Sequence, residues 1–223
     1  MRPPVLFIGL VLAARVLAAA ECRPDHLTPV NPYPGSWHVR YTDLVSKHLE
    51  PPYRFFAGMI VRPSFEGEYS VILHGTKEDY EVDLEKTAKF FLSCFAAEKN
   101  FWYSMPENNQ EKQQKEIKVT VTTGEVAKPL AKRIHLLWVQ MLERTRYFHD
   151  NRIYVDGTTF EFTARGMHGE TRLECTGPTL LVRLGHALVD FCQAPAAERE
   201  AATKNIEKAA SELETYLKAH PAK

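Results

Sequence analysis

The stretch IKVTVTTGEVAKPLAKRIHLLWVQMLER, residues 117–144, contains both periodicities of regular secondary structure and decides the predicted fold class. Its first five residues alternate apolar and polar side chains, which predicts a β-strand with one buried face. Between residues 126 and 144 the apolar side chains recur three and four positions apart, which predicts an amphipathic helix. Strands and helices are therefore both expected in this chain.

Upstream, residues 41–49 are predicted to form a short helix, followed by three segments rich in strand-forming residues. These segments are 53–62, 68–74 and 80–84. A turn-like stretch joins the second to the third, so these two are expected to form a β-hairpin. Residues 86–98 fit either a helix face or a buried strand, and we favour the helix. Residues 107–116 contain no apolar side chain and are expected to be a solvated loop.

Downstream, residues 152–155 and 158–163 flank Asp156-Gly157, a pair that favours a two-residue turn, so a second hairpin is predicted. A strand near 171–174 is followed by a mostly apolar helix that opens at Gly177-Pro178, and a last helix runs from Pro195 to about residue 219. The predicted fold is α+β: an antiparallel sheet of about five to seven strands packed by amphipathic helices, with C-terminal helices.

Residues 1–20 have the order of a cleavable secretory signal peptide: Arg2, a short apolar core, and small residues ending at Ala20. The apolar core is shorter than the roughly 20 residues that cross a bilayer. The alternative is a bacterial lipoprotein with its lipid on Cys22, but Glu21 stands where such signals have a small residue. The protein is therefore expected to be periplasmic or secreted.

After cleavage, residues 21–36 are expected to be a proline-rich extended lead-in, either docked on the domain or loose, and residues 37–223 a single domain. The whole chain has 28 basic and 28 acidic residues, which alternate along it. Nucleic-acid binding usually needs a basic excess on one face, so no nucleic-acid partner is expected. No apolar stretch after the signal is long enough to cross a membrane.

The four cysteines, Cys22, Cys94, Cys175 and Cys192, all follow the signal peptide. An even number in an exported protein is consistent with two disulfides. We favour the pairs Cys94–Cys192 and Cys22–Cys175, because Cys94 and Cys192 lie in apolar segments that are expected to meet in the core. The alternative is that one or more remain buried thiols.

No linear catalytic signature is present, and neither a metal nor another cofactor is expected. His186 and Asp190 are weak catalytic candidates, because a carboxylate four residues along a helix can orient a histidine as a general base. A solvent-facing ion pair on the helix is the simpler interpretation, and we favour it. Asp156 is explained by its turn.

Two groups of residues are candidates for binding. Trp102 and Tyr103 belong to three consecutive aromatic residues beside the polar loop; on a strand, these would point to both faces, so at least one would be exposed. Arg144, Arg146 and Arg152 could together hold an anionic group or partner. The simpler interpretations are core packing for the aromatic residues and local salt bridges for the arginines.

These observations favour an exported, non-catalytic binding or inhibitory protein of unknown ligand, whose partner is another exported protein. The alternatives are an exported hydrolase with a dispersed active site and a structural accessory of an envelope complex. A specific protein partner would favour the first, whereas a deep pocket around His186 would favour the hydrolase.

Overall fold

The structure is a computed structural model and describes residues 26–30, 36–76, 83–108, 115–147, 157–172 and 176–221. Six strands form one antiparallel sheet in the order β4-β3-β2-β1-β5-β6. The strands are β1 Ala57–Arg62, β2 Tyr69–His74, β3 Phe90–Ala97, β4 Val119–Val126, β5 Thr159–Ala164 and β6 Met167–Thr171. The helices are α1 Ser36–Leu49, α2 Phe101–Ser104, α3 Lys128–Leu142, α4 Thr176–Gln193, the 3-10 turn η1 Ala196–Glu198 and α5 Arg199–Ala219. The predicted α+β class is confirmed.

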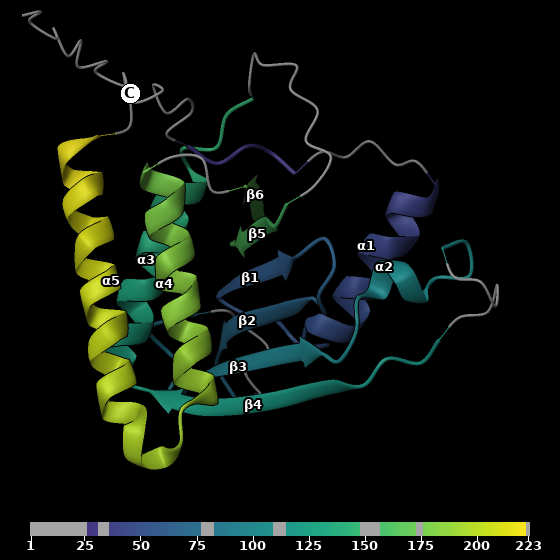
Figure 1. Ribbon diagram of the computed structural model, residues 1–223. Coiled ribbons are helices and arrows are strands. Elements are labelled where there is room, and N and C mark those ends of the chain that lie inside the picture. The colour runs from purple at the N-terminus through teal and green to yellow at the C-terminus, as the bar shows by residue number, and fades with distance from the viewer. Residues whose placement is uncertain are drawn as a thin grey trace, which may run out of the picture.

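The helices cover the two faces of the sheet unequally (Figure 1). α3 and α4 lie on one face, α5 packs on both of them, and the larger hydrophobic core fills the space between helices and strands. α1 and α2 pack on the other face around a smaller core formed by Val45, Leu49, Ile60, Phe101 and Ile117. Because side chains alternate along a strand, each central strand contributes to both faces.

The three long helices after β4 lie where the helical periodicity predicts them. α3 buries Leu130, Ile134 and Trp138 among others, and α4 exposes only a narrow polar stripe that includes Arg183 and Asp190. The predictions of an amphipathic and of a mostly buried helix are therefore confirmed. α1 begins earlier than predicted, at Ser36.

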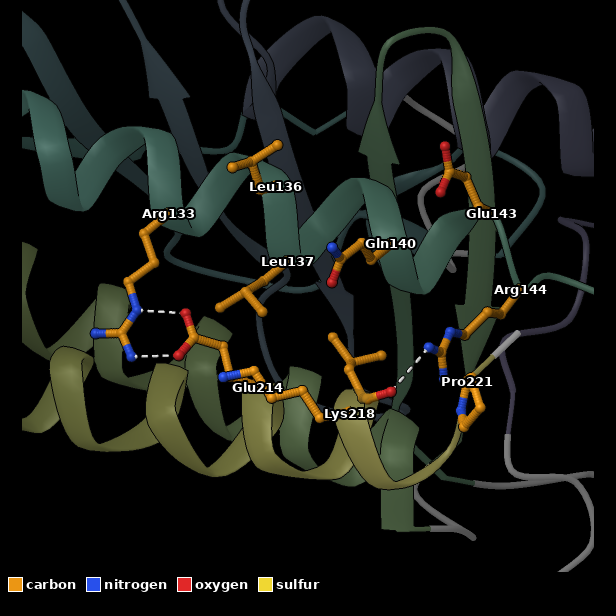
Figure 2. A pocket seen from close by; sticks show the side chains of 10 residues that line it. Arg133, Leu136, Leu137, Gln140, Glu143, Arg144, Glu214, Lys218 and Pro221 are labelled. Atoms are coloured by element: carbon orange, nitrogen blue, oxygen red, sulfur yellow. Dashed lines mark hydrogen bonds and ion pairs between the residues drawn. The ribbon is translucent and has the colours of Figure 1, made fainter.

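Two arginines fix α5 to α3 (Figure 2). Arg133 binds the carboxylate of Glu214 with two nitrogens, at 2.6 and 2.8 Å. Arg144, just beyond α3, donates to the carbonyl oxygens of Leu217 and His220, at 3.3 and 2.5 Å. The last carbonyl groups of a helix have no helical donor, so Arg144 caps the C-terminal end of α5.

β3 occupies residues for which we favour a helix, so that prediction is wrong. Alternate side chains from Phe90 to Cys94 face the larger core, and those between them face the opposite way. Both sides of β3 are covered, so its sequence is nearly continuously apolar and does not alternate. β3 is also the hairpin partner of β2.

The predicted strand at 80–84 is wrong in its described part, because residues 83 and 84 lie in the connection before β3. The rest of the predicted strand falls outside the described residues.

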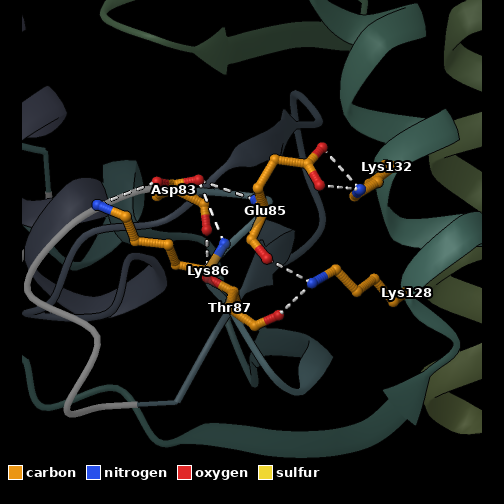
Figure 3. A network of polar contacts seen from close by, with 6 residues as sticks. All are labelled: Asp83, Glu85, Lys86, Thr87, Lys128 and Lys132. Carbon is orange, nitrogen blue, oxygen red and sulfur yellow. Dashed lines mark hydrogen bonds and ion pairs between the residues drawn. The ribbon is translucent and has the colours of Figure 1, made fainter.

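This connection is a turn that α3 holds in place (Figure 3). The carboxylate of Asp83 accepts two backbone N–H groups of the turn. Lys128 donates to the carbonyl oxygens of Glu85 and Thr87, at 2.7 and 3.0 Å, and Lys132 binds the Glu85 carboxylate. The two lysines therefore connect the residues before β3 to the first half of α3.

β4 departs from the prediction that one of its faces is buried along residues 117–121. Ile117 is buried, Val119 is partly buried, and Val121 is 53% exposed. The reason is that β4 is an edge strand, and the smaller core ends beneath Val119. Only the first part of the predicted apolar face is therefore covered.

β5 and β6 are joined by a two-residue turn that was not predicted from the sequence. Arg165 and Gly166 have φ angles of 51° and 74°, and two positive φ values define the type I′ hairpin turn. Arginine is an unusual first residue for this turn.

The first strand of the predicted hairpin around Asp156-Gly157 lies outside the described residues. Its second strand is β5, which pairs with β1 and β6. β6 ends at Thr171, so only the first residue of the strand predicted near 171–174 lies in it; residue 172 is not in a strand, and residues 173 and 174 lie outside the described residues.

The described part of the lead-in, residues 26–30, lies along β6. Thr28 and Glu170 exchange two backbone hydrogen bonds, of 2.9 and 2.7 Å. Leu27 beside them is fully buried in the larger core. Of the two alternatives for this segment, the docked one holds for these five residues.

Candidate functional site

The three consecutive aromatic residues 101–103 form a helical turn, α2, and not the strand that we expected. Asn100 caps this turn, because its Oδ1 accepts the backbone N–H of Trp102 at 2.9 Å. The side-chain nitrogen of Asn100 donates to the carbonyl oxygens of Pro63 and Glu66, at 3.1 and 2.8 Å. Asn100 is buried and therefore fixes the β1–β2 loop against the start of α2.

Apolar side chains are exposed around this junction. The ring of Trp102 is partly buried and packs edge-on against Tyr41 of α1, with 5.5 Å between the centroids. Tyr103 is 47% exposed, and Phe65 of the β1–β2 loop is 72% exposed. Val39 of α1 is also exposed, but it lies two residues before Tyr41, and helix side chains two positions apart do not face the same way, so it stands apart from this junction. We call the set at the junction, which packs on Tyr41 of α1 through Trp102, the α1–α2 apolar surface: Phe65, Trp102 and Tyr103.

Glu68 lies beneath this surface and is fully buried. Its Oε1 accepts a hydrogen bond from the hydroxyl of Tyr41 and its Oε2 from the backbone N–H of Phe101, both at 2.8 Å. Burial raises the pKa of Glu68, although these hydrogen bonds act in the opposite direction. One carboxyl group thus connects α1 and α2 to the end of the β1–β2 loop.

Charged side chains extend from Tyr41 across the same face of the sheet. The guanidinium of Arg62 lies 5.7 Å from the centroid of the Tyr41 ring, and its Nη2 lies 2.6 Å from Oε2 of Glu161. Nδ1 of His168 lies 3.9 Å from the other oxygen of Glu161, and Glu170 of β6 stands directly opposite Glu161. We call this set the charged cluster: Glu50, Arg62, Glu161, His168 and Glu170.

The pKa values within the charged cluster diverge. Burial alone would raise the pKa of Glu161, but His168 and Arg62 lower it below its ordinary value. The Glu161 carboxylate in turn raises the pKa of His168. Burial raises the pKa of Glu50 and of Glu170, and the charge of Glu161 adds to this effect. Divergent pKa values occur at acid–base sites and in structural ion pairs alike. Arg62 and Glu161 are nearly buried, so we assign the cluster a structural role.

A second polar group crosses β2, β3 and β4. Nδ1 of His74 lies 2.6 Å from the carbonyl oxygen of Gly75, which can only accept, so Nδ1 carries a proton. In neutral His74, Nε2 then accepts from the hydroxyl of Ser93 at 2.8 Å, and the Thr123 hydroxyl lies 2.8 Å from the same serine oxygen. This is the arrangement of a serine with its general base. Ser93 is only 3% exposed, however, and the Tyr53 ring packs against His74.

His186 and Asp190, the weak catalytic candidates, lie on the polar stripe of α4. Nε2 of His186 is 3.3 Å from the hydroxyl of Tyr69, and its ring packs edge-on against Phe160. Burial lowers the pKa of His186, while Asp190 acts in the opposite direction. In the described parts of the chain, no serine or cysteine side chain hydrogen-bonds to His186. Its surroundings are those of a histidine packed between a helix and the sheet.

No family of known proteins matches this chain. Neither a curated protein nor a solved structure is detectably similar to it. Within the described ranges, no helix combines the length and the apolar character needed to cross a bilayer. Over the same residues, no three His, Cys, Asp or Glu side chains gather as metal ligands would.

The structure separates the candidate arginines from the candidate aromatic residues. Arg144 caps α5 in the helical layer, whereas Trp102 and Tyr103 lie with α1 on the other side of the sheet. Arg146 is exposed, and its backbone N–H donates to the carbonyl of Leu27 at 3.0 Å. Arg152 lies outside the described residues. The groove between α3 and α5 in Figure 2 has its arginines engaged by Glu214 and by carbonyl groups, so these do not form an open anion site.

Cys94 of β3 and Cys192 of α4 are buried free thiols that lie close to each other. The neighbouring Cys192 thiol, together with burial, raises the pKa of Cys94. The two segments meet in the core as expected, whereas the disulfide between them stays a prediction. Cys22 and Cys175 lie outside the described residues.

Proposed function

We propose that this chain is an exported, non-catalytic protein that binds another exported protein through the α1–α2 apolar surface. The observation that carries the proposal is the exposure of Phe65 and Tyr103 on two segments that Asn100 ties together. Aromatic side chains are enriched among the residues that dominate the energy of protein–protein interfaces. The signal-like order of residues 1–20 supports export.

The rigidity of the surface also supports this proposal. Asn100 holds the loop that carries Phe65, and Glu68 holds both helices that flank it. A surface that is already ordered loses little conformational entropy when it binds, so more of the contact energy appears as affinity. The exposed groups are apolar, and a protein partner with its own apolar patch matches them.

Photo-crosslinking of the exported full-length protein tests this proposal. A photoreactive residue at position 103 is expected to capture one protein of the same compartment, and Phe65→Ser is expected to reduce that capture about 30-fold, as loss of a hot-spot residue does. The thermal midpoint of unfolding should not change, because Phe65 is mostly exposed. Mass spectrometry of the crosslinked product identifies the partner.

Tyr147 provides the matched control for this experiment. It is an exposed tyrosine beyond the end of α3, at 77% exposure, and does not belong to the α1–α2 apolar surface. The same photoreactive residue at position 147 should capture nothing specific. Equal capture from positions 103 and 147, or capture that Phe65→Ser leaves intact, would contradict the proposal. Capture of a large envelope assembly would instead favour a structural accessory.

An exported hydrolase is the second candidate, and the Ser93–His74 pair is the observation that favours it. His186 and Asp190 contribute less to it, since no described serine or cysteine side chain bonds to His186. A nucleophile must be reached by its substrate, and Ser93 and His74 are both buried. We therefore rank the hydrolase below the binding protein. Covalent labelling of Ser93 in the native protein by a fluorophosphonate would reverse this order.

Export also bears on the proximity of Cys94 and Cys192. In an oxidising compartment we expect a thiol–disulfide oxidoreductase to join their Sγ atoms, so that two electrons and two protons pass to the disulfide of that enzyme. Alkylation of the mature protein in denaturant should then leave both residues unlabelled without reductant and label both after reduction. Denaturant is needed because buried thiols escape labelling in the native protein. Full labelling without reductant would show that the pair remains reduced.

A further inference from the structure

The two edges of the sheet differ in how they are covered. At one edge, Thr28 pairs with Glu170 of β6. At the other edge lies β4, and no strand of the described chain pairs with its outer side. An unpaired edge presents rows of backbone donors and acceptors that another extended chain can bind.

The backbone groups that face outward on β4 can be identified from two hydrogen bonds. The N–H of Glu98 donates to the carbonyl of Lys118 at 2.9 Å, so residue 118 faces β3. In an antiparallel pair the facing residues alternate, so Val119, Val121, Thr123 and Glu125 direct their N–H and C=O groups away from β3. In agreement with this, the Thr123 carbonyl accepts a bond from the Arg199 side chain, at 3.3 Å.

The side chains of β4 do not block pairing with another strand. Natural edge strands are commonly blocked by proline, lysine or a bulge, but the stretch from Val119 to Val126 contains neither proline nor lysine and pairs with β3 without interruption. Val121 at its centre is 53% exposed. The Arg199 side chain donates to one outward-facing carbonyl group of β4, that of Thr123. A carbonyl oxygen has a second lone pair, so this group can still accept a hydrogen bond from another strand.

We infer that β4 pairs antiparallel with β4 of a second copy of this chain. A twofold axis at Val121 places Val121 opposite its own copy and Val119 opposite Thr123 of the other chain. The outward-facing N–H and C=O groups of the two β4 strands then form about six backbone hydrogen bonds. The exposed valine side chains cover each other as cross-strand neighbours.

The charges at the two ends of β4 favour a second copy over an unrelated strand. With the twofold axis at Val121, Glu125 of one chain lies diagonally across from Lys115 of the other, and because side chains alternate along a strand these two lie on the same face. Glu116 and Lys118 belong to the opposite face. Antiparallel self-pairing therefore brings a basic side chain before one strand near an acidic side chain at the end of the other. The interface is also isologous and closes on itself, which gives a dimer rather than a fibre.

Sedimentation equilibrium of the mature protein tests this inference. We expect wild type to have twice the mass of one chain, and Val121→Pro to have the mass of one. Proline is informative here because the N–H of Val121 faces away from β3, so its loss removes no hydrogen bond from the monomer. Val121→Lys should also be monomeric, and it keeps the inference testable if the proline variant does not fold.

Val39→Lys is the matched control, since it makes the same substitution at another exposed valine, on α1. This variant should remain dimeric. Hydrogen exchange adds a local readout, because the amides of Val121 and Thr123 should be protected in wild type and exchange freely in Val121→Lys. A wild type that is monomeric at all concentrations overturns the inference. A dimer that persists in both Val121 variants, or larger polymers that depend on Val121, also overturns it. The α1–α2 apolar surface is not involved, so this result leaves the proposed function untouched.

Discussion

Trp138→Ala is expected to lower the free energy of unfolding by about 3 to 5 kcal/mol, the range found when a large core side chain is truncated. Trp138 is 1% exposed, and its ring packs edge-on against Phe162 with 5.6 Å between centroids. Its Nε1 donates to the carbonyl of Gly58 at 3.1 Å, which ties α3 to β1. The substitution opens a cavity between helix and sheet and also removes this bond, so the effect should lie in the upper part of the range.

Urea unfolding followed by far-UV circular dichroism measures this effect. Leu136→Ala is the control, because Leu136 lies on the same helix but is mostly exposed. It should change the free energy of unfolding by no more than about 0.5 kcal/mol. A small effect at Trp138, or equal effects at both positions, would mean that α3 does not pack on the sheet as described.

Arg62→Met is expected to cost about 3 to 5 kcal/mol at neutral pH, because it removes the nearer of the two basic side chains beside the buried Glu161 carboxylate. Both side chains are nearly buried, and Nη2 of Arg62 lies 2.6 Å from Glu161. The double variant Arg62→Met, Glu161→Gln should recover much of the loss, since no unpaired charge then remains buried. Arg54→Met, at an exposed arginine, should be nearly neutral and controls for the loss of one positive charge.

The pH dependence gives the Arg62 prediction a second signature. The folded-state pKa of Glu161 is lowered, so the stabilisation from its ionised form is present above its unfolded pKa and is lost as pH falls through its folded pKa. The cost of Arg62→Met should therefore be largest at neutral pH and should shrink in acid, where Glu161 is protonated in both proteins. A cost that is the same at both pH values would show that Arg62 acts through packing and not through charge.

The parts of the fold that could be predicted are those in which one side of an element is buried. α3 and α5 have such a side, so their apolar residues recur with helical periodicity. β3 is covered on both faces, and a continuous apolar run fits either helix or strand, which is why Phe90–Ala97 was predicted wrongly. Whether the second face of a sheet is covered depends on residues far away in the sequence, here those of α1. The sequence of the strand alone therefore cannot show it.

The same limit applies to the candidate site. Glu161 stands at a polar position of an alternating strand, which predicts a solvated residue, yet α1 and its neighbours leave it only 8% exposed. Tyr103 was a candidate because aromatic residues beside a polar loop are typical of binding surfaces. Phe65 could not be found in this way, because the hydrogen bonds of Asn100 and Glu68 that bring its loop to α2 join residues far apart in the sequence.

The pairing of β1 with β5 sets the order in which this chain can fold. Arg62 stands opposite Thr159, so this contact joins residues about 100 positions apart, whereas the β1–β2 and β5–β6 pairs are hairpins between sequence neighbours. Closing so long a loop costs more chain entropy than forming either hairpin. The β1–β4 meander can therefore assemble while β5 is still unattached, and β1 remains an open edge until the last third of the polypeptide arrives.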